Sequence, residues 1–297
     1  MSTVVSFMLI VPERRQSIFQ KMDRALLRLS ASQEPDSVHS FRTTSRRLQT
    51  LLEQIVPNRD RNEKKLLKML DRIRRRAGKV RDLDVQLAAL RSLKVPQEPR
   101  RKTQLMHSLI ELRVKHDKKL NKLLNKETIH EIRKRLKRAC RKANLVAGGN
   151  ALPSARAILA QIVRPAGPVT EDVLHQYRIA VKRARYAAEF APKSAEAAQF
   201  IAQLKRLQDA LGNWHDWLTL TNTAAKQLGD VNQSTLVAAL HNVTRGKFRQ
   251  AVAALTASQP LLSSGRKVAH SPERSPAHSA KPGARHPATA DTAKTAA

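Results

Sequence analysis

The sequence predicts an all-α fold. Apolar residues recur at spacings of three and four in long stretches such as LMHSLIELRVKHDKKLNKLL, which is the periodicity of an amphipathic helix. The alternation typical of a β-strand is confined to one short stretch near the N-terminus, VVSFMLIV. A basic helical motif also occurs twice in the chain. This repeat predicts two helical bundles related by a pseudo-twofold axis.

Breaks rich in proline, glycine and small polar residues divide the helical region. They fall at QEPDS, at Pro57-Asn58, at VPQEP, at GGNALPS and at RPAGP. We therefore expect a helical domain over residues 1–262, with a first half at about 6–145 and a second half at about 150–258. Residues 263–297 are rich in Ser, Pro and Ala with scattered bases, so we expect a disordered basic tail.

The charge of the chain predicts a polyanionic partner. Lys and Arg number 56 against 24 Asp and Glu, a formal net charge of +32, and such self-repulsion is a cost to a compact fold. Nucleic acid, an anionic membrane or a phosphate polymer would each compensate it. The single cysteine, Cys140, excludes an internal disulfide and fits a reducing cytoplasm, and we expect it to be a small core residue. VVSFMLIV is too short to span a bilayer and lacks a basic n-region, so neither a membrane partner nor a signal peptide is expected.

The repeated motif places cations and a histidine on one helix face. The first copy is HSFRTTSRRLQTLLE and the second is HQYRIAVKRARYAAEF. The matched residues are His39, Arg42, Arg46, Arg47 and Glu53 in the first copy, and His175, Arg178, Lys182, Arg183 and Glu189 in the second. At 100° per residue the histidine and the main-face bases gather opposite an apolar stripe. This mixture of imidazole, guanidinium and ammonium suits phosphoryl oxygens, whereas Arg47 and Arg183 lie off that face and fit a solvated role equally well.

The repeat continues into the next helix. Leu70, Ile73, Gly78, Asp82 and Leu83 match Leu204, Leu207, Gly212, Asp216 and Trp217. We interpret each glycine as the end of a helix. The acids Asp82, Asp84 and Asp216 then fall in the first turn of a further helix, where they stabilise its dipole and find partners such as Arg76 and Arg81. The polar side of the helix before the glycine carries Lys64, Lys68, Arg72, Arg75 and Lys79, and Lys205 and Arg206 in the second half.

The sequence contains no catalytic set. It has no GxxxxGK[ST] loop, no GxSxG elbow and no paired-carboxylate signature. His39 and His175 could meet across the axis and bind a cation, and Asp82, Asp84 or Asp216 could contact Mg²⁺, but the surrounding cations repel a metal. We therefore expect a protein that is not an enzyme and needs no metal or other cofactor.

Four motifs in order carry a family resemblance. HSFRTTSRRLQTLLE, GKVRDLDV, LHQYRIAVKRARYAAEF and LKRLQDALGNWHDW together resemble the CHAD domain, the conserved histidine α-helical domain, over about residues 6–255. The resemblance implies two four-helix bundles around a basic central cavity. It also implies binding of inorganic polyphosphate and association with polyphosphate granules. The chain shows no ExExK-like pattern of a CYTH-type triphosphatase, so it resembles a free-standing member.

By position, the resemblance implies four polyphosphate contacts in each half. They are His39, Arg42, Arg46 and Arg72, then His175, Arg178, Lys182 and Arg206. Additional phosphate contacts are expected from Arg47, Lys68, Arg75, Lys79, Arg183, Arg185 and Lys205. His215 stands where the first half has Arg81, which puts equal contact from the two halves in question.

Two other functions stay open. A nucleic-acid partner is allowed by the charge, but aromatic residues make up only 3% of the chain and no known DNA- or RNA-binding motif occurs. A metal-dependent phosphohydrolase using Asp82, Asp84 or Asp216 is the second alternative.

Overall fold

The computed structural model describes residues 10–259, apart from 56–58, 95–97, 145–150, 163–166 and 230. Within these residues the regular structure consists of nine α-helices and one π-helical turn, with no strand, so the predicted all-α class is confirmed. Most of VVSFMLIV and the whole of the predicted tail lie outside the described residues. None of the described helices combines the length and the apolar character needed to cross a bilayer.

The helices follow one another with short connections. The first half contains α2 (Ile10–Ala31), α3 (Pro35–Thr50), the π-helical turn η1 (Leu51–Ile55), α4 (Arg61–Ser92), α5 (Pro99–Asn121) and α6 (Lys126–Asn144). The second half contains α7 (Ala151–Ala160), α8 (Glu171–Ala188), α9 (Ala195–Leu228) and α10 (Thr235–Ala257). The described halves thus hold five and four α-helices, and two matched four-helix bundles around a central cavity stay a prediction.

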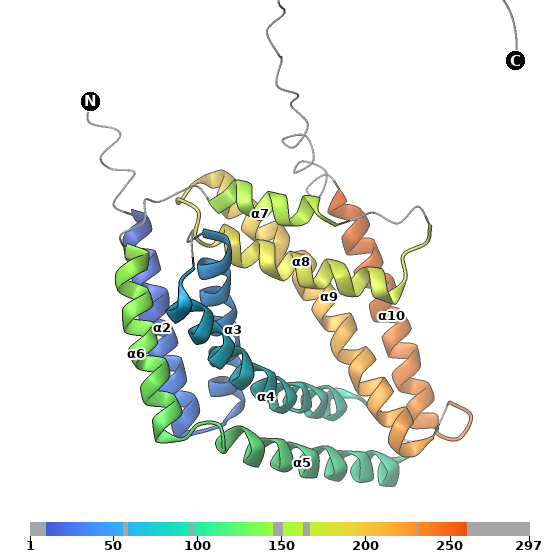
Figure 1. The fold of residues 1–297 in the computed structure, drawn as a ribbon. Coiled ribbons are helices and arrows are strands. Elements are labelled where there is room, and N and C mark those ends of the chain that lie inside the picture. Colours follow the sequence, from blue (N-terminus) through green and yellow to red (C-terminus); the bar gives the residue numbers. More distant parts are fainter. Residues whose placement is uncertain are drawn as a thin grey trace, which may run out of the picture.

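Two long helix pairs dominate the shape of the molecule. Figure 1 shows α4 lying along α5 and α9 lying along α10, with the far ends of the two pairs meeting. At the other ends, α3 and α6 pack against α4 and α2 packs against α3 and α6, while α8 packs against α9 and α7 packs against α8. The halves contact each other through α3 with α8 and through α4 with α9. These last four helices carry the repeated motif.

The two halves share their hydrophobic cores. The larger core joins residues of both copies of the motif, including Phe41, Leu70, Tyr177 and Trp214. A second core lies where the two long pairs meet and contains Leu87, Leu90, Leu105, Leu220, Leu236 and Leu240. Burial of these side chains, at roughly 1.5–3 kcal/mol each, fixes the halves relative to each other.

Polar caps set the helix starts after the predicted breaks. The Asp60 carboxylate accepts a hydrogen bond from the Glu63 amide, and the Glu63 carboxylate accepts one from the Asp60 amide, each at 3.0 Å. This capping box starts α4 directly after Pro57-Asn58. Hydroxyl caps start α8, α9 and α10 at Thr170, Ser194 and Ser234.

The prediction that Gly78 and Gly212 end helices is wrong. Gly78 lies inside α4, which runs for 32 residues, and Gly212 lies inside α9, which runs for 34. A glycine inside a helix costs about 1 kcal/mol relative to alanine. The apolar stripe continues on both sides of each glycine and is buried along its length, which offsets that cost. Asp82, Asp84 and Asp216 therefore lie in mid-helix, where the dipole of a first turn does not act on them.

Candidate functional site

The predicted cationic face of α3 points away from the core. Val38, Phe41 and Leu48 are buried on one side of the helix. His39 and Arg46 are exposed on the other side, and Arg42 is half-buried between α3 and α4. The face predicted from helical periodicity is therefore present in the structure.

Arg42 lies directly over Gly78 of α4. Its Nη1 donates a long hydrogen bond of 3.5 Å to the carbonyl oxygen of Arg74, and its Nη2 is 3.9 Å from Oδ1 of Asp82. A Cβ atom added to Gly78 would overlap the Nη1 atom of Arg42. The glycine inside α4 thus makes room for a guanidinium, which explains why a helix keeps it at this position.

Sequence reasoning missed Arg74, which supports this corner of the site. Arg74 is buried, with Nη2 at 2.5 Å from Asp71 Oδ1 and Nη1 at 3.4 Å from Ser45 Oγ. Burial lowers its pKa, and the nearby charges of Arg46 and Arg42 lower it further. A signal was available, because residues four apart share a helix face and Arg74 precedes Gly78 by four.

The second copy builds the matching face on α8. Tyr177, Val181 and Ala184 are buried. His175 is exposed, and Arg178 and Lys182 are half-buried. The His175 ring stacks on the ring of His215 from α9, with centroids 5.6 Å apart and planes 27° apart. His215 therefore joins the site at the position where the first half has Arg81.

The two faces come together as one cationic cluster, which we define as His39, Arg42, Arg46, Arg81, His175, Arg178 and Lys182. Burial lowers the pKa of Lys182 to about 8, and Arg178, Arg46 and Arg42 contribute to this shift. Burial likewise lowers the pKa of Arg42, with contributions from Arg46, Arg81 and Arg178. Because residues of each half act on the other half, the cluster is a single electrostatic unit.

The two histidines share this environment. Burial lowers the pKa of His39, and the charges of Arg81 and Arg42 lower it further. Burial also lowers the pKa of His175, followed by His215 and Arg178. Both imidazoles therefore favour the neutral form until an anion approaches.

Among the described residues, Asp82 and Asp216 are the acids that favour the charged forms of Arg42, Arg178 and Lys182. Asp82 lies near Arg42 and Arg178, and Asp216 lies near Arg178 and Lys182. Asp82 keeps 56% and Asp216 keeps 42% of its side chain exposed. Within the described residues, the buried Nε of Arg178 has no hydrogen-bond partner. The cluster thus retains unused positive charge and unused donors.

Two other candidates, Arg47 and Arg185, form a structural contact between the halves. Arg47 Nε donates to Glu189 Oε2 at 2.6 Å and Arg47 Nη2 donates to Glu189 Oε1 at 3.2 Å, so α3 is tied to α8. Arg185 donates to Glu189 Oε1 at 2.9 Å and to Gln208 at 2.9 Å. Both guanidiniums also lie over the Tyr186 ring. Arg47 and Arg185 are therefore engaged in holding the halves together, and Glu189 pairs across the halves as well as locally.

The remaining candidates lie on other surfaces. Lys68, Arg72, Arg75 and Lys79 line a groove between α4 and α5. Arg183 is exposed on α8, and Lys205 and Arg206 are exposed on α9. The structure therefore brings six of the eight principal candidates into the cluster and separates Arg72 and Arg206 from it.

The acids considered for a metal have other roles. Asp84 is buried and accepts a hydrogen bond of 2.7 Å from Nε of Arg113 on α5, so its partner is neither Arg76 nor Arg81. Asp82 and Asp216 lie among cations. In the part of the chain that the structure describes, no group of three His, Cys, Asp or Glu residues could hold a metal ion. Cys140 is half-buried against the core, and this burial raises the pKa of its thiol.

Comparison with known proteins assigns the family. The family model of the CHAD domain matches residues 15–225, which is more than half of the chain. The chain therefore belongs to the CHAD family. The match ends before α10, although α10 packs along α9 as part of the same fold.

Two solved structures share the fold. The CHAD domain from the plant Ricinus communis is 18% identical, with a TM-score of 0.56 over 88% of this chain and 91% of that chain. PptA from Streptomyces chartreusis is 15% identical, with a TM-score of 0.56 over 84% of this chain and 96% of that chain. No curated protein matches the sequence.

Proposed function

We propose that the cationic cluster binds inorganic polyphosphate. The observation that carries the proposal is the convergence of Arg42, Arg178 and Lys182, from both copies of the repeat, in one half-buried site. There Arg178 disfavours the charge of Arg42, and both arginines disfavour the charge of Lys182. Half-buried cations without enough counter-charge are costly to a fold. A bound polyanion would offset that cost and would satisfy the unused donors. The resemblance to the CHAD domain points to the same ligand.

A chain of phosphoryl groups fits the cluster better than a nucleic acid does. Each unit of polyphosphate carries charge, so successive units can contact successive side chains with no base or sugar between them. Single-stranded nucleic acids are usually held by exposed aromatic rings. The aromatic residues beside the cluster, Tyr186 and Trp214, are 5% and 1% exposed and cannot serve as stacking surfaces.

The proposed activity is binding without catalysis. Asp84, one of three acids available for a metal, is engaged with Arg113, and Asp82 and Asp216 lie close to arginines and a lysine. Electrostatic capture, with release of condensed counterions, then supplies most of the affinity. A protein of this kind would gather where the polymer accumulates, so we propose association with polyphosphate granules in the cytoplasm.

A competition assay tests the proposal against both alternatives. Labelled long-chain polyphosphate is displaced by unlabelled polyphosphate or by duplex DNA at equal phosphate concentration, with Mg²⁺ present and released phosphate measured in the same tubes. We expect polyphosphate to compete at a much lower concentration than DNA, without phosphate release. Equal competition by DNA would support a nucleic-acid partner. Phosphate release that is lost in Asp82→Asn or Asp216→Asn would support a hydrolase.

A further inference from the structure

A second concentration of positive charge lies outside the cluster, in the groove between α4 and α5. The groove has a volume of about 630 Å³. Its α4 wall carries Lys68, Arg72, Arg76 and Lys79, and the opposite wall carries Lys119 of α5 and Lys122, which caps the C-terminus of α5. Cations on two facing walls of one groove are suited to a ligand that is anionic along its whole length.

The charges of this groove are close together and poorly compensated. Burial lowers the pKa of His116 on α5, and Lys119, Lys79 and Arg76 add to the shift. The acid among the lining residues is Asp71, whose carboxylate is already shared between Arg74 at 2.5 Å and Arg75 at 2.6 Å. Positive charge therefore prevails throughout the groove.

The second half of the chain shows that the fold does not need these cations. When Gly78 is matched to Gly212, Lys68, Arg76 and Lys79 of α4 correspond to Ala202, Ala210 and Asn213 of α9. Both helices are long, and each packs along a partner helix, α4 along α5 and α9 along α10. At these three positions α4 carries basic residues and α9 carries neutral ones. Lys68, Arg76 and Lys79 are thus an addition to the first half that packing does not explain, whereas Arg72 has a basic counterpart in Arg206.

The groove borders the cationic cluster. Asp71 holds Arg74, which is buried and influenced by Arg42 and Arg46 of the cluster. The other oxygen of Asp71 holds Arg75, which is 81% exposed and lines the groove. Asp71 and Arg74 therefore connect the groove to the cluster along α4.

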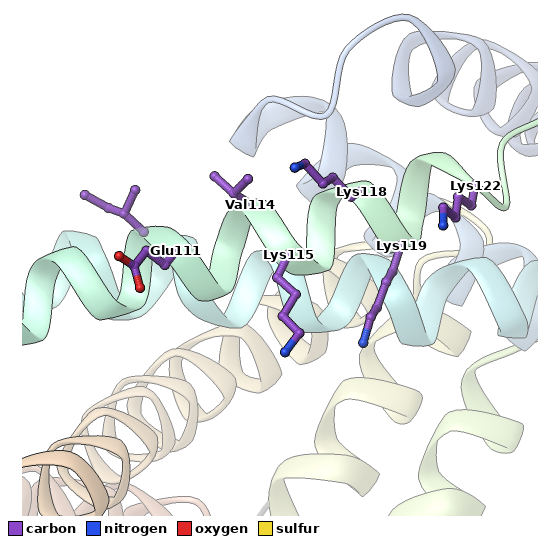
Figure 2. Close-up of a pocket in the computed structure, with 7 residues that line it drawn as sticks. Glu111, Val114, Lys115, Lys118, Lys119 and Lys122 are labelled. Carbon is purple, nitrogen blue, oxygen red and sulfur yellow. The ribbon is translucent and has the colours of Figure 1, made fainter.

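The basic surface continues beyond the groove. Lys119 and Lys122 also line a hollow of about 500 Å³ on the outside of α5, together with Lys115 and Lys118. Figure 2 shows Lys115 and Lys119 pointing to the same side of α5, with Lys122 near the end of the helix. Cations therefore continue from the groove to the outer face of α5.

We propose that the α4–α5 groove binds a second segment of the same phosphoryl chain, so that the protein holds long chains at two places and short ones at one. The inference rests on the proposed function of the cluster. Because the second contact is made by a chain that is already bound, it raises the affinity for long chains through effective concentration.

The test compares tripolyphosphate with long-chain polyphosphate on three double variants of the whole chain. Arg72→Gln/Arg76→Gln removes two groove cations, and Arg42→Gln/Arg178→Gln removes two cluster cations. The matched control is Arg245→Gln/Arg249→Gln, which removes two exposed arginines with the same spacing of four on α10. Acylation of lysines, measured by mass spectrometry, reports directly whether a bound ligand protects Lys79, Lys119 and Lys122.

We expect the groove variant to bind tripolyphosphate as the parent does and to bind the long chain roughly tenfold more weakly. The long chain protects the three groove lysines from acylation, and tripolyphosphate leaves them reactive. The cluster variant loses affinity for both tripolyphosphate and the long chain, and the control variant binds both as the parent does.

The outcomes separate the two proposals. If the cluster variant loses tripolyphosphate while the groove variant keeps full affinity for long chains, the groove inference is overturned and the proposed function stands. If the groove variant loses both ligands equally, the groove is no separate site. If the cluster variant keeps both ligands, the proposed function itself fails.

Discussion

At the scale of single residues, Lys182 is the cation whose charge the fold disfavours most clearly. Its pKa is lowered from 10.5 to about 8 by burial and by Arg178, Arg46 and Arg42. The side chain is charged below that pH and loses its proton above it. A phosphoryl neighbour favours the charged form, so binding is coupled to proton uptake in the range just above pH 8.

The first prediction follows from this coupling. Affinity for polyphosphate should fall as the pH rises through about 8, by up to about tenfold per pH unit, because Lys182 loses its charge there. Lys182→Arg keeps its charge and should remove this dependence, whereas Lys205→Arg on the exposed side of α9 should not. Binding titrations about one pH unit below and one pH unit above the pKa of Lys182 measure this pH dependence. A parent protein with the same affinity at both values would contradict the coupling.

Gly78 and Gly212 provide a matched pair for the second prediction. A Cβ added at Gly78 overlaps Nη1 of Arg42, whereas one added at Gly212 has no neighbour within 4 Å. Gly78→Ala should displace Arg42 and weaken polyphosphate binding roughly three- to tenfold. Gly212→Ala should leave affinity unchanged. Both should keep or raise thermal stability, by up to about 1 kcal/mol, because alanine favours the helix. Equal affinities of the two variants would show that Arg42 does not need the space.

Residue-level prediction from the sequence succeeded where helical spacing carries the information. His39, Arg42 and Arg46 share a face because of their spacing, and the structure places them together with the second copy. Arg74 shares a helix face with Gly78 by its spacing, but spacing alone could not show that Arg74 is buried against Ser45 of α3. It also could not show that Arg72 belongs to a different groove, because that depends on where α5 lies.

At the scale of elements, the halves are joined through α3 and α8 by Arg47 and Glu189. The two residues are 142 positions apart in the sequence and form a two-pronged contact at 2.6 and 3.2 Å. No local pattern predicts such a pair. In the repeat, Arg47 matches Arg183 and Glu189 matches Glu53, so a symmetric structure would pair Arg183 with Glu53. Glu53 instead lies 3.8 Å from Nη1 of Arg59 and accepts a hydrogen bond from the side chain of Gln49.

The third prediction tests the role of Arg47. Arg47→Met should lower the free energy of unfolding by about 1–2 kcal/mol, because Glu189 loses a partly buried partner. Polyphosphate affinity should change by less than about twofold. Arg183→Met, at the matching and exposed position of α8, should change neither. Chemical denaturation and binding titrations supply the values. An affinity loss as large as that of Arg42→Ala would place Arg47 in the binding site.

The continuity of α4 and α9 shows a second limit of local patterns. In the sequence, a glycine followed by acids resembles a helix end. The propensity cost of one glycine is small beside the burial of the apolar side chains that precede and follow it. Long-range packing therefore decides the length of both helices, and Gly78 makes room for Arg42, whereas a Cβ at Gly212 would have no neighbour within 4 Å.

At the scale of the whole molecule, the far ends of the two helix pairs are joined by polar contacts above the second core. The Glu98 carboxylate accepts hydrogen bonds from the Ser234 hydroxyl at 2.8 Å and from the Leu236 amide at 2.9 Å. Arg101 Nη1 donates to the carbonyl oxygen of Gln233 at 2.6 Å. The bond from Leu236 and the bond from Ser234 lower the pKa of Glu98. This contact is therefore present at neutral pH and is lost as the pH falls through the lowered pKa.

The fourth prediction concerns this junction. Glu98→Gln should speed amide hydrogen exchange at Leu236 and the first turn of α10 several-fold, because the charged acceptor is lost. Exchange at Phe41 in the larger core should be unchanged. Glu111→Gln, at an exposed acid of α5, is the control. Unchanged exchange at Leu236 would show that the second core alone holds the pairs together.

The most direct test of the account is polyphosphate affinity for the parent, Arg42→Ala, Arg178→Ala and the double variant, each at two salt concentrations. One arginine comes from each copy of the repeat, and both lie in the cluster. Each single change should weaken binding by roughly 1–3 kcal/mol and reduce the salt slope, with the double variant weaker still. Removal of residues 263–297 should have little effect. If the arginine variants bind as the parent does while that removal abolishes binding, the site is outside the cluster and the account is wrong.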